Sequence, residues 1–292
     1  GVCQSARAPC HMRQSWRRCG PWSPRSARPR SASWSVPSNA VSGIYLAVPK
    51  RGDGPASHIV FIVRDDDGNS DVLFQTSDTT WQAYNLYGGN SLYSCTVACP
   101  PGNPDGYKGA YKVSYNRPFN TAEDDSGRSW LFSGGEWPMI RFLEANGYNV
   151  SYVSGVDVHR RGQLLLNHDL FISSGHDEYW SRSQRTSMET ARNAGVNLAF
   201  FTGNTGFWKT RWEPSADGAS TQDRTLVSYK ETHANAKIDP NAAWTGTWRD
   251  PRFSPPADGG RPENALTGTI FTVDAYREDS IKVPSADGKY AS

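Results

Sequence analysis

Residues 170–181 read Leu-Phe-Ile-Ser-Ser-Gly-His-Asp-Glu-Tyr-Trp-Ser, and the architecture of the chain can be worked out from them. The apolar run predicts a buried strand over 169–173, and Ser181 is placed to cap a helix over 182–194. Between the two stand four consecutive side chains that bind protons or metals. Because ligands of open α/β sheets bind beyond the carboxyl ends of strands, we expect a functional site at this junction. An ordinary helix cap with His176 in a loop is the plainer alternative.

The flanking segments continue the alternation of strand and helix. A helix over 136–146 ends at Gly147 and precedes a strand over 149–153, and a buried strand over 196–201 follows the second helix. This order predicts βαβ units and therefore an α/β fold with a mostly parallel sheet flanked by helices. Long decorating loops and short extra β strands complete it, the strand-like runs being 44–48, 58–63, 71–75, 225–227, 269–273 and 280–283.

Composition divides the 292 residues into two parts. Residues 1–36 form an Arg/Ser/Pro-rich head with seven arginines and no acid, which we expect to be disordered. Residues 37–292 form a single α/β domain that holds 24 Lys and Arg against 29 Asp and Glu, so its charge argues against binding of nucleic acid. No apolar run reaches the ~18 residues of a membrane span. The head also lacks the apolar core of a secretory signal.

Two of the five cysteines, Cys95 and Cys99, are close enough in sequence to form a small disulfide loop. Such a pair favours an oxidising, extracytoplasmic compartment. A zinc site would need two more soft ligands nearby, and the sequence offers none.

The motifs of familiar hydrolases are missing. A Ser/His/Asp enzyme needs a Gly-x-Ser-x-Gly elbow, whereas the turn Gly203-Asn204-Thr205-Gly206 after the buried strand raises an asparagine, which is suited to donating a hydrogen bond to a substrate carbonyl. The histidines outside the junction lack the spacing of a zinc site. An oxygen-only site remains, because tyrosine phenolates and Glu178 are hard donors for a hard cation.

Two tyrosine-rich segments, 79–93 and 111–120, could supply such phenolates. Aromatic and amide side chains alternate there with glycines, without the apolar periodicity of a core element. A surface on which the phenols are simply hydrogen-bonded is the equal alternative.

Four motifs together resemble the C-terminal catalytic domain of the N,N-dimethylformamidase large (beta) subunit family. They are Trp81-Gln-Ala-Tyr84-Asn85, Ser114-Tyr115-Asn116, the His176-Asp-Glu178-Tyr stretch and Thr202-Gly-Asn204. The resemblance covers about residues 40–285 and implies a glutamine-amidotransferase-like (flavodoxin-like) fold.

The resemblance also implies a mononuclear ferric ion, Fe(III), held by Tyr84, Tyr115 and Glu178. His176 and Asn204 then fall on active-site positions of the family.

A further catalytic glutamate of the family corresponds to Glu231 or Glu263, and spacing does not decide between them. The implied activity is metal-dependent hydrolysis of a linear amide, with a small amide as substrate and dimethylformamide only one candidate. A homo-oligomer or additional domains are compatible with the family. Two alternatives stay open: an extracellular binding or accessory module without catalysis, and hydrolysis of another kind of C–N bond.

Overall fold

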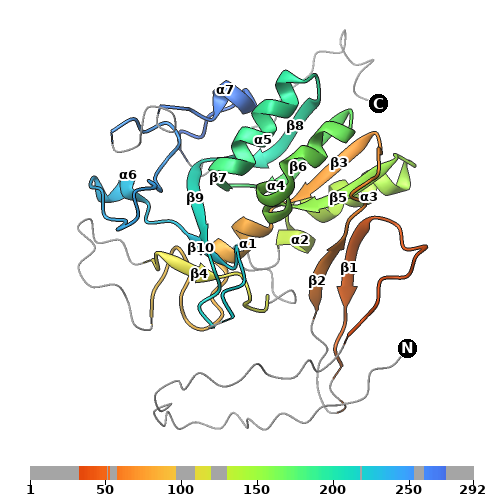
Figure 1. Ribbon diagram of the computed structural model, residues 1–292, viewed down its shortest axis with the longest axis horizontal. Helices are drawn as coiled ribbons and strands as arrows, with labels where there is room; N and C mark the ends of the chain where they lie inside the picture. Colours follow the sequence, from red (N-terminus) through yellow and green to blue (C-terminus); the bar gives the residue numbers. More distant parts are fainter. Residues whose placement is uncertain are drawn as a thin grey trace, which may run out of the picture.

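The computed structural model describes residues 33–50, 52, 58–96, 109–119, 130–217, 219–252 and 260–273. In this part the chain forms one parallel sheet, one small mixed sheet and one two-stranded hairpin, with helices packed around them (Figure 1). Most of the predicted head, the predicted strand over 280–283 and Cys99 lie outside the described residues.

The parallel sheet is the centre of the molecule. Its strands are β3 (Val72–Thr76), β5 (Val150–Ser154), β6 (Leu170–His176) and β8 (Asn197–Gly203), in the order β5-β3-β6-β8. All three pairings are parallel, which confirms the predicted α/β class. If these four strands are numbered 1 to 4 along the chain, their order in the sheet is 2-1-3-4. The chain therefore leaves β3 toward one edge of the sheet, to β5, and leaves β6 toward the other edge, to β8. A crevice for ligands is expected at the carboxyl ends of β3 and β6.

Both faces of this sheet are covered, because successive side chains of a strand point to opposite faces. One face packs against α4 (Gly155–Arg161), the 3₁₀ helix η1 (Gly162–Asn167) and α5 (Arg182–Asn193). The other packs against α2 (Trp130–Ser133), α3 (Glu136–Ala145) and the antiparallel hairpin β1 (Gly43–Ala47) and β2 (Ile59–Val63). The predicted helices over 136–146 and 182–194 are confirmed as α3 and α5.

The second sheet has the order β4-β10-β9-β7 and consists of short strands. They are β4 (Lys112–Ser114), β10 (Thr225–Val227), β9 (Trp208–Glu213) and β7 (Tyr179–Ser181). Only two residues, Asp177 and Glu178, lie between the end of β6 and the start of β7, so they join the two sheets. A separate core lies beneath the small sheet and includes Leu92, Tyr179, Trp208 and Leu226.

Several elements differ from the prediction. Helix α1 (Asp78–Tyr84) forms within the tyrosine-rich segment that lacks apolar periodicity. Helix α4 begins with a capping box between Ser154 and Asp157, and the short helices α6 (Glu231–Ala234) and α7 (Asn264–Thr267) interrupt the loops of the tail. The predicted strand over 269–273 is wrong, since these residues follow α7 without pairing to any described strand. Among the described residues no helix is long and apolar enough to cross a membrane.

Candidate functional site

The junction after β6 presents its side chains to two different surroundings. His176 and Glu178 are two residues apart in nearly extended chain and therefore point to the same side. Asp177 points the other way, into the interior, where its Oδ2 accepts hydrogen bonds from Gln75 Nε2 and Ser173 Oγ, each at 2.7 Å. Both acids are buried, but Asp177 points into the interior and Glu178 points toward the carboxyl edge of the sheet.

Four side chains converge at this edge, and we call them the Glu178 cluster: Tyr84, Tyr93, His176 and Glu178. The Tyr84 hydroxyl donates to Glu178 Oε2 (2.9 Å), and the Tyr93 hydroxyl donates to Oε1 (2.8 Å). His176 Nε2 lies 3.2 Å from Glu178 Oε2. The two phenol rings stack with centroids 4.1 Å apart. Three oxygen-bearing groups and one imidazole therefore share a single small volume at the β3/β6 crevice.

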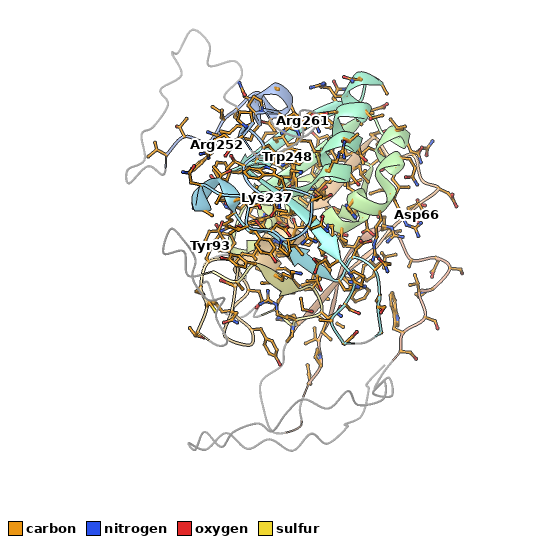
Figure 2. The ribbon with its side chains drawn as sticks, turned by 60° about the vertical axis from the view of Figure 1, so that its left-hand side comes forward. Asp66, Tyr93, Lys237, Trp248, Arg252 and Arg261 are labelled. Carbon is orange, nitrogen blue, oxygen red and sulfur yellow. The ribbon has the colours of Figure 1, made fainter. Side chains whose placement is uncertain are left out.

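Tyr84 and Tyr93 reach the cluster from the two ends of one loop. Tyr84 is the last residue of α1, and the chain then folds back so that Leu92 N donates to Ala83 O (2.8 Å). The Arg117 guanidinium holds this loop by donating to the carbonyl oxygens of Asn85 and Asn90, both at 2.7 Å. In Figure 2, Tyr93 lies on the side of the molecule away from Asp66.

Lys230 lies beneath the cluster and was not singled out by the sequence. Its Nζ donates to Leu92 O (3.1 Å) and stands 3.4 Å from the centroid of the Tyr93 ring. Its backbone adopts the left-handed conformation with φ 49°, which is uncommon for a residue with a Cβ. Burial lowers the pKa of Lys230 to about 7, although the negative charge of Glu178 acts in the opposite direction. Lys230 directly precedes Glu231, the residue of this segment that the family resemblance suggested.

The surroundings keep the carboxylate ionised. Burial alone would raise the pKa of Glu178, but the hydrogen bond and charge of His176, the charge of Lys230 and the hydrogen bond from Tyr93 outweigh it, so the pKa lies below its ordinary value. Burial, reinforced by the charge of Glu178, raises the pKa of Tyr93 well above its ordinary value. The cluster thus combines an anionic Glu178 carboxylate with a protonated Tyr93 phenol beside it.

The structure does not bring Tyr115, the second predicted phenol, to Glu178. Tyr115 follows β4, and its hydroxyl donates to the carboxylate of Asp78 at the first residue of α1. Burial, together with the charge of Asp78, raises the pKa of Tyr115 well above its ordinary value. Tyr93 occupies the place beside Tyr84 and Glu178 instead.

Asn204 lies next to the cluster. Gly203, the last residue of β8, is paired with His176 across the parallel ladder, and Asn204 follows it with φ 51°. A Cβ at position 203 would stand 3.1 Å from His176 Nδ1, so the glycine allows the imidazole to lie close against the turn. The asparagine and the histidine thus emerge from neighbouring strand ends.

The two candidate glutamates are bound to local partners. Both oxygens of Glu231 accept backbone hydrogen bonds, from Ile238 N (2.9 Å), Asp239 N (2.8 Å) and Thr245 N (2.8 Å). Glu263 pairs with the guanidinium of Arg249. Within the described part of the chain, neither carboxylate has a hydrogen bond to the Glu178 cluster.

The donors of the cluster decide which cation would suit it. No group of three or more His, Cys, Asp or Glu side chains that could hold a metal occurs among the residues that the structure describes. The Glu178 cluster instead offers two phenol oxygens and a carboxylate, which are hard donors and suit a hard, highly charged cation. Elsewhere, Cys95 is disulfide-bonded, and its predicted partner Cys99 is not described.

Comparison with known protein families gives a match over nearly the whole chain. The family described as N,N-dimethylformamidase beta subunit-like, C-terminal, matches residues 1–291, which confirms the resemblance carried by the four motifs. No curated protein matches the chain.

Proposed function

Because the chain belongs to the N,N-dimethylformamidase beta subunit-like C-terminal family, we propose that it is an iron-dependent hydrolase of linear amides with the Glu178 cluster as its active site. The observation that carries the proposal is the convergence of the Tyr84 and Tyr93 hydroxyls on the two oxygens of one buried carboxylate. Two phenols and one glutamate are the donor set that the family resemblance implies for a mononuclear ferric ion.

The fold proposal rests on the parallel sheet. The strand order 2-1-3-4 and the position of the cluster at the β3/β6 crevice support the glutamine-amidotransferase-like (flavodoxin-like) fold, because ligands of such sheets bind at the point where the strand order reverses.

Tyr84, Tyr93 and Glu178 would hold the iron, with Tyr93 taking the place first assigned to Tyr115. The two phenols would bind as phenolates after releasing their protons to solvent, and the three anionic oxygens would match a trivalent charge. Iron, when bound, supplies a Lewis acid for the amide carbonyl.

The residues around the ion would bind the amide and carry its proton. The His176 side chain is 22% exposed and its Nε2 lies beside Glu178, so the imidazole can hold a proton and give it to the leaving nitrogen. The Asn204 side chain would donate a hydrogen bond to the carbonyl oxygen. Water adds to the carbonyl carbon, the C–N bond breaks, and the amine leaves with the proton and the acid remains. We assign no proton transfer to Glu231 or Glu263, since both carboxylates already have local partners.

Metal content tests this assignment. We expect the purified wild-type protein, loaded with iron, to contain about one ferric ion per chain and to show the visible absorption of tyrosinate bound to Fe(III). Tyr84→Phe and Tyr93→Phe should each lose the absorption and most of the iron, whereas Tyr115→Phe should keep both. Hydrolysis of a panel of short amides, measured as the release of amine, should be lost in the same two variants.

Two results would contradict the proposal. A colourless protein that takes up no iron and hydrolyses no amide would favour the binding or accessory module. Loss of iron in Tyr115→Phe with retention in Tyr93→Phe would overturn the choice of phenols.

A further inference from the structure

A pocket of about 530 Å³ lies at the opposite end of α1 from the Glu178 cluster. Asp78 and Trp81, on the first turn of α1, line it, whereas Tyr84 at the end of the helix belongs to the cluster. The other walls are strand β2, the start of α4 and the segment 115–119. No residue of the Glu178 cluster contributes to its lining, so the pocket is separate from the proposed active site.

One side of the pocket is apolar. Phe61 from β2, Trp81 from α1 and Phe119 contribute aromatic rings, and the Trp81 and Phe119 rings meet edge to face with centroids 5.7 Å apart. Aromatic side chains arranged in this way offer flat contact surface to an apolar or aromatic group.

Three of the four arginines in the lining already have partners. Arg64 forms ion pairs with Asp66 (2.7 Å) and Asp157 (2.8 Å), and Arg160 pairs with Asp223 (2.8 Å). Arg117 holds the loop after α1 through backbone carbonyl oxygens. These guanidinium groups build the wall and do not need a ligand.

Arg224 is different, because it forms no ion pair with any residue that the structure describes. Its guanidinium carbon lies 5.6 Å from the centroid of the Tyr115 ring, and the side chain is only partly buried. A guanidinium that is partly removed from water favours an anionic partner, and its planar donors fit the two oxygens of a carboxylate.

The acids in the lining limit the charge of such a partner. Asp78 and Asp157 both face the pocket, and a ligand with two negative charges would be repelled by them. A single negative charge on an otherwise apolar molecule satisfies Arg224 and is repelled only about half as strongly.

We propose that this pocket binds an organic monocarboxylate, with its carboxylate on Arg224 and its apolar or aromatic part against Phe61, Trp81 and Phe119. This is a second binding site, independent of whether the Glu178 cluster holds iron.

Calorimetric titration of the full chain with benzoate tests the proposal, with benzamide as the neutral analogue and inorganic phosphate as the polar anion. We expect benzoate to bind in the millimolar range or tighter, and benzamide and phosphate to bind at least about tenfold more weakly. Arg224→Gln should weaken benzoate binding by about tenfold or more. Arg141→Gln, an exposed arginine of α3 outside the pocket, should leave it unchanged.

Ile59→Glu provides a second variant that does not touch Arg224. Ile59 lines the pocket and is 57% exposed, so a carboxylate there should be tolerated by the fold and should repel benzoate. Failure of benzoate to bind, equal binding of benzamide, tighter binding of phosphate, or unchanged affinity in both variants would overturn the proposal.

Discussion

Glu136 lies at the first residue of α3 and is fully buried. Its Oε1 accepts hydrogen bonds from Trp81 Nε1 (2.9 Å) and Ser77 N (3.2 Å), while Oε2 has no partner among the described residues. Burial raises the pKa of Glu136 well above its ordinary value, and these hydrogen bonds only partly oppose the effect. The side chain is therefore held as a neutral acid over a range of pH in which an exposed glutamate would be ionised.

We expect Glu136→Gln to flatten the dependence of stability on pH. Because the pKa is higher in the folded chain than in the unfolded one, the contribution of Glu136 is complete below its ordinary pKa of 4.5 and is lost as pH rises through the raised value. Glutamine reproduces the neutral acid and cannot ionise. Urea unfolding between about pH 5 and pH 9 should show a shallower loss of stability in the variant than in the wild type. Glu144→Gln, exposed on the same helix, should follow the wild type; an equal slope in Glu136→Gln would contradict this reading.

The residues of the site were predictable where they depend on local geometry. His176 and Glu178 could be found because an extended chain after a buried strand directs alternate side chains to one side. The sequence could not predict that Tyr93, and not Tyr115, lies beside Glu178, because the position of Tyr93 depends on a loop held by Arg117. The partners of Arg117 in that loop, Asn85 and Asn90, lie about thirty residues away in sequence. Lys230 reaches the cluster only through tertiary folding.

At the scale of elements, the spacing of apolar residues predicted the helices that pack through apolar contacts. Helix α5 was predicted to within a residue, with Met188 and Ala191 fully buried as expected. Helix α1 was missed because much of its packing is polar: Thr79 Oγ1 donates to Tyr179 O (2.9 Å), and Thr80 Oγ1 accepts from Glu178 N (3.0 Å). Helix α4 carried a readable signal, the Ser154-x-x-Asp157 capping box.

The loop around α6 gives a prediction at this scale. Glu231 accepts three backbone N–H groups and pairs with Lys237 (3.1 Å), so it ties together the loop that begins at Lys230. We expect Glu231→Gln to lower the free energy of unfolding by about 2–3 kcal/mol, since the amide cannot accept on both sides and leaves a buried N–H unpaired. Urea unfolding would measure the loss.

Glu213→Gln is a matched control. The wild-type Glu213 carboxylate pairs with Lys112 and Arg211 near the surface. The free energy of unfolding of this variant should fall by less than about 1 kcal/mol. If Glu231→Gln kept wild-type stability but lost amide hydrolysis, Glu231 would be the catalytic glutamate after all.

At the scale of the whole molecule, the parallel sheet was predictable and the small sheet was not. Helices α3 and α5, which lie between strands of this sheet, show a clear period, and their alternation with apolar strands predicted βαβ units and a parallel sheet. Strands β4 and β10 are three residues each and pair across more than a hundred residues of sequence, as in Leu226 opposite Val113. Nothing local in either strand indicates such a partner.

The small sheet nevertheless supports the tyrosines of the proposed active site, because its core includes Ala83, next to Tyr84 in α1, and Leu92, next to Tyr93 in the loop. Leu226→Ala, at a fully buried position of that core, should lower the free energy of unfolding by ~2–5 kcal/mol. Leu143→Ala on α3 removes a similar side chain from the core between α3 and the parallel sheet, at a comparable cost in the free energy of unfolding. Hydrogen exchange under native conditions should distinguish them: the amides of residues 84–93 should exchange faster in Leu226→Ala and at the wild-type rate in Leu143→Ala. Equal acceleration in both variants would mean that the loop depends on global stability alone, and that the small sheet has no special part in holding the site.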